Sequence, residues 1–244
     1  MDDSPSASSL GGLIQFIGTP IGNLGDITFR AVACLKSAQV IACEDTRHSQ
    51  RLLQHLEIRD KILLAVHDHN EQQRAAQLVT RAQQGERIVY LSDAGTPSIA
   101  DPGYRLVNAC IAAGVAVEII PGPSAVTTAL AGSGLPSDSF YFGGFLPVKS
   151  GRKEKTLVSA LARAETSIFF ESPHRIAKTL ATLAKLDPTR ETCVARELTK
   201  RFETYHRGLA ASLAAEFAAK PAKGEITLLI RGIGHRRDDS QEHA

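Results

Sequence analysis

The stretch IVYLSDAGTPSIADPGYRLV, residues 88–107, joins a short apolar run to a long loop and then to a helical pattern. The run Ile88–Leu91 is brief and rich in branched apolar residues, which is typical of a buried parallel strand. Residues 92–103 are mostly small residues, glycines and prolines, and loops of this length in a compact domain are usually functional. A strand, a loop and a helix in this order form the repeating unit of an α/β protein.

The same unit recurs on both sides of this stretch. The sequence predicts further strands at 13–17, 40–42, 62–66 and 115–120. It predicts helices at 28–38, 46–56, 70–84 and 103–113. Strands that alternate with helices in this way indicate a mostly parallel sheet.

Beyond Gly122 the pattern changes. The sequence predicts strands at 139–143, 166–170, 191–196, 202–207 and 225–231. It predicts helices at 150–163, 173–185 and 209–219. The strands at 191–196 and 202–207 follow each other without a helix between them, which indicates antiparallel pairing in a mixed sheet.

The chain therefore reads as two α/β domains, and its 244 residues are enough for one large domain or two small ones. We expect a disordered lead at 1–12, an N-terminal domain at 13–121, a C-terminal domain at 122–233 and a disordered tail at 234–244.

Composition excludes several classes of protein. Apolar residues make up 43% of the chain, which is enough for a packed core and argues against wholesale disorder. No stretch approaches the roughly 20 apolar residues of a membrane span, and the acidic, polar start does not resemble a signal peptide. The scattered cysteines form no CxxC pair, which argues against a zinc ribbon or a disulfide scaffold and favours a reducing cytoplasm.

The charge is distributed unevenly along the chain. Residues 1–121 carry 10 basic and 13 acidic side chains, a net charge of −3, and residues 122–244 carry 18 basic and 13 acidic ones, a net charge of +5. A basic second half fits a polyanionic partner. It also fits a solvated helix face, which charge alone favours.

Ligands of open α/β sheets bind beyond the carboxyl ends of the strands, so the loops there are the candidate site. The first loop, 18–26, has three glycines and a proline but is neither a dinucleotide fingerprint nor a P-loop. In the second, 44–48, Asp45 or Thr46 could simply cap a helix, or the acids and Arg47 could hold a hydroxyl or a phosphate.

The third loop, 66–71, contains His67 and His69 beside carboxylates, but no third residue has the spacing of a zinc ligand, so we expect no metal. A polar cluster that contacts substrate, or a helix cap at Asn70, fits this loop better. The small residues of 92–103 leave backbone groups free to bind a ligand, and the helix that starts at Pro123 and Ser124 could hold a carboxylate.

The second half contributes basic segments. Lys149, Arg152, Lys153 and Lys155 have no interleaved aromatic residue, which indicates a flexible phosphate-contacting loop and not a stacking platform. The chain has no GxSxG and no cysteine in a catalytic context, so hydrolases, kinases and metalloproteases find no support.

Nine segments of these loops, in order, resemble the tetrapyrrole methylase superfamily. They are TPIGNLGDIT (19–28), CEDTRHS (43–49), HDHNE (67–71), SDAGTPSIADPGYRLV (92–107), IPGPSA (120–125), SGLPSDSFYFGGFLP (133–147), FFESPHRI (169–176), ARELTK (195–200) and KGEI (223–226). Within the superfamily they are similar to the branch that methylates the ribose 2′-oxygen of cytidine 1402 in 16S rRNA, at the decoding centre of the small ribosomal subunit.

The resemblance implies two α/β domains with S-adenosylmethionine (AdoMet) in a cleft between them, a homodimer, and a cytoplasmic enzyme. It implies that many cofactor contacts are made by backbone atoms. The implied cofactor-binding residues are Pro20, Gly95, Thr96, Ile99, Ala100, Ser124, Ala125, Phe170, Ala195, Gly224, Glu225 and Ile226.

An alcohol is a weak nucleophile, so a general base is expected among the first-domain loops, where His67 and Glu71 are further candidates. The catalytic residues favoured here are Glu44, Asp45, Arg47 and His69. The candidates for binding RNA are Arg30, Lys149, Arg152, Lys153, Arg175, Lys200 and Arg201. Family members often continue past the last strand, so the segments 149–155 and 196–207 are expected to carry more of the RNA docking here.

Two rival functions remain open at this stage. The superfamily also methylates tetrapyrrole (corrin) precursors on carbon, although residues 94–97 are Ala-Gly-Thr-Pro where those enzymes carry a Gly-Asp-Pro type motif. The other rival is a non-catalytic ribosome-binding protein, against which the intact loops at 92–103 and 120–125 argue.

Overall fold

The computed structural model describes residues 12–67 and 70–234, and the chain divides into two units after Ser124. The sequence placed this boundary after Pro121. Apart from Gly12 and Gly234, the predicted lead and tail lie outside the described residues. No helix in the described ranges is both long and apolar enough to cross a membrane.

The first unit contains a five-stranded sheet in the order β3-β2-β4-β1-β5, with every pair parallel. Its strands are β1 (Leu13–Ile17), β2 (Val40–Cys43), β3 (Ile62–Ala65), β4 (Ile88–Leu91) and β5 (Ala116–Ile120). All five strands were predicted from the sequence, within one or two residues. Because they run in one direction, their carboxyl ends share one edge of the sheet.

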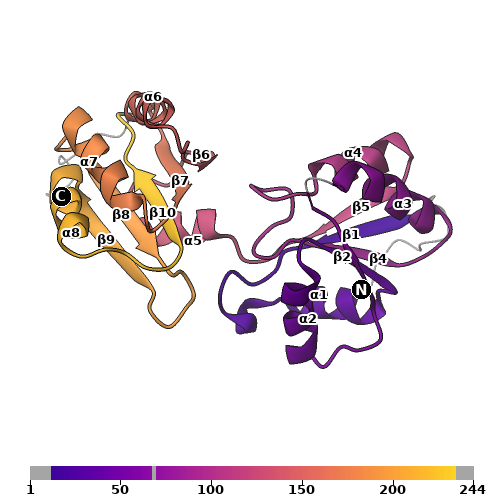
Figure 1. The fold of residues 1–244 in the computed structure, drawn as a ribbon. Helices are drawn as coiled ribbons and strands as arrows, with labels where there is room; N and C mark the ends of the chain where they lie inside the picture. The colour runs from indigo at the N-terminus through magenta and orange to yellow at the C-terminus, as the bar shows by residue number, and fades with distance from the viewer. Residues whose placement is uncertain (1–11, 68–69, 235–244) are drawn as a thin grey trace, which may run out of the picture. The chain divides into compact units, whose positions relative to one another are not determined.

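Helices cover both faces of this sheet (Figure 1). They are α1 (Phe29–Ser37), α2 (Thr46–His55), α3 (Glu71–Gln83) and α4 (Tyr104–Ala112), and a 3-10 turn, η1 (Leu24–Asp26), precedes α1. Ile14 and Phe16 of β1 pack with α3 and α4, whereas Ile17 packs on the other face with α1 and α2. This alternation follows from the two-residue period of a strand.

The second unit contains a mixed sheet in the order β6-β7-β10-β8-β9. Its strands are β6 (Phe140–Phe145), β7 (Thr166–Glu171), β8 (Glu191–Arg196), β9 (Thr204–Leu209) and β10 (Ile226–Ile230). β6 and β7 are parallel and the other pairs are antiparallel, which confirms the pairing predicted for the two strands around 191–207.

The helices of the second unit also lie on both faces of their sheet. They are α5 (Ala125–Ser133), α6 (Ser150–Leu161), α7 (Ile176–Leu186) and α8 (Ala210–Ala219). Side chains of α6, α7 and α8 form one core with Phe169, Val194 and Leu228. α5 lies against the opposite face, where the Tyr205 hydroxyl of β9 donates to the Thr128 carbonyl.

Helix α7 begins later than its sequence predicts. Ser172 and Pro173 were expected to start it, but the helix starts at Ile176. The Ser172 carbonyl accepts from the backbone N–H groups of both Arg175 and Ile176, so these residues form a turn before the helix.

Two glycines fix the spacing of the loops that follow β1 and β5. The N–H of Gly18 donates to the Ile120 carbonyl at 3.0 Å. A Cβ at Gly122 would lie 2.5 Å from the Gly18 carbonyl oxygen, and a Cβ at Gly18 would lie 2.8 Å from the Gly122 nitrogen. The two loops therefore touch backbone to backbone, which any side chain at either position would prevent.

We expect Gly122→Ala to destabilise the protein by about 1–3 kcal/mol, because the new methyl group overpacks a rigid backbone contact. Urea unfolding of the variant and the wild type measures this difference. The matched control is Gly151→Ala in α6, where an added Cβ meets nothing within 4 Å. A Gly122→Ala midpoint no lower than that of Gly151→Ala would contradict the proposed packing.

Candidate functional site

The loops after β1 and β4 are joined by a short bridge. The N–H of Thr19 donates to the Gly95 carbonyl at 2.9 Å, and the N–H of Gly95 donates back to the Thr19 carbonyl at 3.1 Å. The buried Thr19 hydroxyl donates to the Ser92 carbonyl at 3.2 Å. A long glycine-rich loop is thus held at a fixed distance from the loop that contains Pro20.

The loop after β2 is tied to the same place. Asp93 accepts the backbone N–H of Asp45 through its carboxylate at 3.1 Å. The loops after β1, β2, β4 and β5 therefore form one hydrogen-bonded group at the carboxyl edge of the sheet.

A buried carboxylate fixes the far end of the loop 92–103. Oε1 of Glu71 accepts the N–H groups of Gly103 and Arg105 at 2.9 and 3.0 Å, and Glu71 is only 4% exposed. These are free N–H groups at the start of α4, where a negative charge is stabilising. Glu71 was considered as a base from the sequence, but these contacts give it a structural role.

The backbone of the loop 92–103 is strained at two residues that are not glycine. Ser98 and Ala100 adopt left-handed conformations with φ of 72° and 61°, which cost energy in residues other than glycine. The buried Ser98 hydroxyl has no hydrogen-bond partner among the described residues. Ile99 and Ala100 are exposed.

These features fit AdoMet, whose adenine edge and amino-acid end need hydrogen-bond donors and acceptors. A Cβ at Gly95 would lie 3.5 Å from Ile21 and 3.8 Å from the Pro123 carbonyl, so segments from three loops meet around a residue without a side chain. Small residues thus let these loops approach one another closely.

Asp45 and Arg47 pair with each other. Asp45 is the N-cap of α2, and its carboxylate accepts the N–H of Arg47 at 2.8 Å and the Arg47 guanidinium at 2.7 Å. Hydrogen bonding by Arg47 lowers the pKa of Asp45 to about 2. A carboxylate with so low a pKa is a weak base, so the geometry favours the capping role for Asp45 over the catalytic one.

Glu44 lies at the end of β2 in an acidic neighbourhood. Burial raises the pKa of Tyr90 well above its ordinary value, and the charges of Glu71, Glu44 and Asp101 raise it further. The Tyr90 hydroxyl is fully buried and has no hydrogen-bond partner among the described residues. Cys43 of β2 pairs with Leu91 of β4, so Glu44 lies beside the start of the loop 92–103.

In the third loop, 66–71, the structure contradicts the predicted cap at Asn70 and leaves the prediction for His69 untested. Asn70 makes no side-chain cap of α3, because its Oδ1 accepts the N–H of His67 at 2.9 Å instead. His69 lies outside the described residues. Among the residues that are described, no group of three His, Cys, Asp or Glu side chains could hold a metal ion.

In the second unit, two of the proposed cofactor residues, Phe170 and Ala195, fall on one row of the sheet. Phe170 of β7 and Ala195 of β8 both pair with Thr227 of β10, so these three side chains share a face. Ile226 lies in the next row with its side chain on the opposite face, buried in the core with Phe169 and Leu228. The centroid of the Phe170 ring lies 5.0 and 5.3 Å from those of Phe142 and Phe145.

An ion-paired turn lies beside this row. Glu197 accepts the N–H of Glu225 at 2.9 Å, and Lys200 contacts the carboxylates of Glu197 and Glu225, each at 3.1 Å. A Cβ at Gly224 would collide with Glu197, so glycine is required for this close approach. Lys200 is committed to this turn, which weakens its assignment to RNA.

A buried polar network overturns one of the predicted RNA contacts. Glu171 of β7 is buried, and its carboxylate accepts the Thr179 hydroxyl at 2.7 Å and pairs with Arg175. The Lys153 ammonium donates to the same hydroxyl at 3.0 Å, and Lys153 is only 8% exposed. The prediction that Lys153 contacts RNA is therefore wrong, since its ammonium group is buried and hydrogen-bonded inside the unit.

Arg175 also has an internal role, because its guanidinium donates to the Leu146 carbonyl at 3.1 Å. Lys149, Arg152 and Arg201 are exposed, and Arg30 is exposed with a distant contact to Glu118 at 3.9 Å. The segment 149–155 lies largely in helix α6 and does not form the flexible loop that was expected.

Replacement of Glu71 by alanine should free the end of the loop 92–103. Two backbone N–H groups lose their acceptor, at a cost of about 1–3 kcal/mol. Hydrogen exchange of the peptide that covers 92–105 should accelerate in Glu71→Ala. The control is Glu86→Ala, which removes the partly buried ion pair with Arg81 outside this peptide and should leave its exchange unchanged. Unchanged exchange in Glu71→Ala would refute the anchoring role.

The chain is similar to known proteins over most of its length. The family described as Tetrapyrrole (Corrin/Porphyrin) Methylases matches residues 14–214. Ribosomal RNA small subunit methyltransferase I of Vibrio cholerae is 48% identical over 235 residues, covering 95% of this chain and 81% of that protein. The protein of the same name from Escherichia coli O157:H7 is 45% identical over 242 residues, covering 98% and 84%.

Solved structures support the fold. Uroporphyrin-III C-methyltransferase from Thermus thermophilus aligns with a TM-score of 0.62 at 20% identity, covering 89% of this chain and 94% of that one. A diphthine synthase aligns with a TM-score of 0.67 at 15% identity, covering 90% of each chain. The family model and the sequence relatives show that the chain belongs to the tetrapyrrole methylase family and, within it, to the ribosomal RNA small subunit methyltransferase I group.

Proposed function

We propose that the chain transfers a methyl group from AdoMet to the ribose 2′-oxygen of cytidine 1402 in 16S rRNA of the small ribosomal subunit. The observation that carries this proposal is the 45–48% identity, over at least 95% of the chain, to the two relatives named above. The substrate also suggests a cytoplasmic enzyme. The homodimer that the resemblance implies is part of the same proposal.

The cofactor-binding residues of the proposal come from both units. In the first unit they are Pro20, Gly95, Thr96, Ile99, Ala100 and Ser124. In the second unit they are Ala125, Phe170, Ala195, Gly224, Glu225 and Ile226. The strained loop 92–103 and its bridge to Thr19 support the first set, and the shared row of Phe170 and Ala195 supports the second.

AdoMet supplies an electrophilic methyl group on a sulfonium ion. The protein has to align the ribose hydroxyl, restrain water and accept one proton. Of the predicted catalytic residues, we propose Glu44 as the group that accepts the proton of the 2′-hydroxyl. Asp45 is held by Arg47 with a pKa of about 2, whereas Glu44 follows directly on a buried strand at the loop edge.

The two adjacent carboxylates offer a matched pair of variants. Glu44→Gln should lower kcat by roughly 10²–10⁴-fold, the usual contribution of a general base, and leave AdoMet affinity nearly unchanged. Asp45→Asn should retain most of kcat, because asparagine caps a helix as well as aspartate does. Single-turnover methyl transfer and calorimetric AdoMet titration measure both quantities. Equal losses of kcat in the two variants would contradict the assignment of the base.

Methyl transfer from labelled AdoMet to three acceptors tests the function itself. The acceptors are small ribosomal subunits that lack native methylation, naked 16S rRNA, and a tetrapyrrole precursor. We expect label in the assembled subunit, because a preformed RNA shape presents the target ribose to a compact enzyme. Label only in the tetrapyrrole would assign the chain to the other branch of its superfamily. Binding to subunits without AdoMet affinity would instead indicate a non-catalytic ribosome-binding protein.

A further inference from the structure

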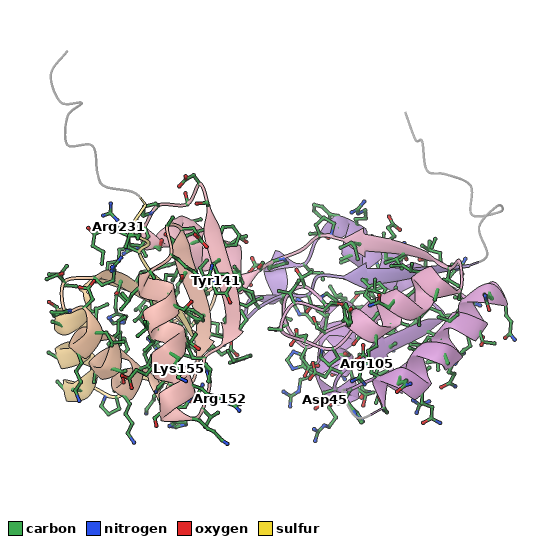
Figure 2. All side chains as sticks on the ribbon, turned by 90° about the horizontal axis from the view of Figure 1, so that it is seen from above. Asp45, Arg105, Tyr141, Arg152, Lys155 and Arg231 are labelled. Atoms are coloured by element: carbon green, nitrogen blue, oxygen red, sulfur yellow. The ribbon has the colours of Figure 1, made fainter. Side chains whose placement is uncertain are left out.

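Helix α6 carries a polar stripe along one side. At 3.6 residues per turn, Lys149, Arg152, Lys155, Thr156 and Ser159 fall within about one third of the helix circumference. The apolar side chains that α6 buries lie next to this stripe and not on it. Arg152 and Lys155 are labelled on α6 in Figure 2.

The stripe leads into a groove between α6 and strand β6. The groove has a volume of about 260 Å³ and is lined by Tyr141, Phe169, Arg163 and four residues of α6, Lys155, Thr156, Ser159 and Ala160. Tyr141 lies on the strand next to this helix in Figure 2. The segment 149–155 contains no aromatic residue, but the fold places Tyr141 beside it.

The Tyr141 ring already stacks on one face with an arginine side chain. The Arg163 guanidinium lies over the Tyr141 ring at 3.6 Å from its centroid, and Phe169 contacts the same ring edge-on. Arg163 also pairs with Glu165 at 2.9 Å, which balances its charge. The outer surface of this guanidinium is therefore suited to stack on a flat, neutral group such as a nucleobase.

Three exposed cations of the segment 149–155 supply the positive charge that a phosphate needs. Lys149, Arg152 and Lys155 are exposed, and none of them forms an ion pair within the described part of the chain. Lys155 lines the groove itself, beside the hydroxyl groups of Thr156 and Ser159. One unpaired cation, two hydroxyls and a stacking surface match the phosphate, sugar and base of one nucleotide.

We propose that this groove binds a nucleotide of the substrate RNA outside the methylated one, with the exposed cations of α6 contacting phosphates along the same strand. The inference rests on the proposed function, because it takes the polyanion to be ribosomal RNA. The net charge of +5 on residues 122–244 favours a polyanion such as RNA over a basic or neutral partner.

Two neighbouring residues provide the test. Ser159→Glu puts a negative charge in the groove, and Val158→Glu puts the same charge on the other side of α6, where Val158 is 50% exposed. We expect Ser159→Glu to raise the Kd for unmethylated small ribosomal subunits roughly tenfold and Val158→Glu to leave it within about twofold. Calorimetric AdoMet titration and urea unfolding check that both variants are folded.

Two further variants separate stacking from charge. Arg163→Lys keeps the charge but loses the flat guanidinium, so subunit affinity should fall roughly tenfold. Lys155→Ala should reduce the slope of log Kd against log salt by about 0.7 to 0.9.

If Ser159→Glu and Val158→Glu weaken subunit binding equally, the proposal that the groove binds RNA is overturned, since net charge alone would then explain the loss. Wild-type affinity in Ser159→Glu and Arg163→Lys would overturn it as well, and the proposed function would stand if methyl transfer to the subunit persisted. A wild-type chain that neither binds nor methylates the subunit would overturn both proposals.

Discussion

The paired hydrogen bonds between Thr19 and Gly95 are the contact on which the proposed cofactor site depends. They join two loops that belong to adjacent parallel strands, β1 and β4. The Gly18–Gly122 contact adds the loop after β5, and the Asp93–Asp45 hydrogen bond adds the loop after β2. Loops fixed in this way lose little conformational entropy when a ligand binds to their backbone groups.

A second constraint governs the other unit. The buried carboxylate of Glu171 has to be compensated, and Arg175 and Thr179 contact it directly while Lys153 reaches it through Thr179. This network fixes the rotation of α6 against the sheet. With Lys153 turned inward, Arg152 and Lys155 remain exposed, and Lys155 lies beside Tyr141 and Arg163. One lysine is thus committed to the interior of the unit, whereas its exposed neighbours belong to the proposed RNA-binding groove.

The sequence predicted the strands of both sheets because short apolar runs and glycine-ended helices are local signals. It also predicted the loops at the carboxyl edge, since parallel topology brings them together. It could not show that Lys153 is buried or that Tyr141 lies beside α6, because both depend on contacts between distant residues. Likewise, the distinction between Asp45 and Glu44 required the geometry of the helix cap.

The most direct test is the position of the methyl group in RNA from small subunits treated with the protein and AdoMet. Alkali cleaves RNA next to a free 2′-hydroxyl and spares the bond next to a methylated one. Mass spectrometry of the alkaline digest should show an alkali-resistant dinucleotide that begins with cytidine 1402. A methylated base at that position, or a resistant dinucleotide from elsewhere in the RNA, would contradict the proposed function.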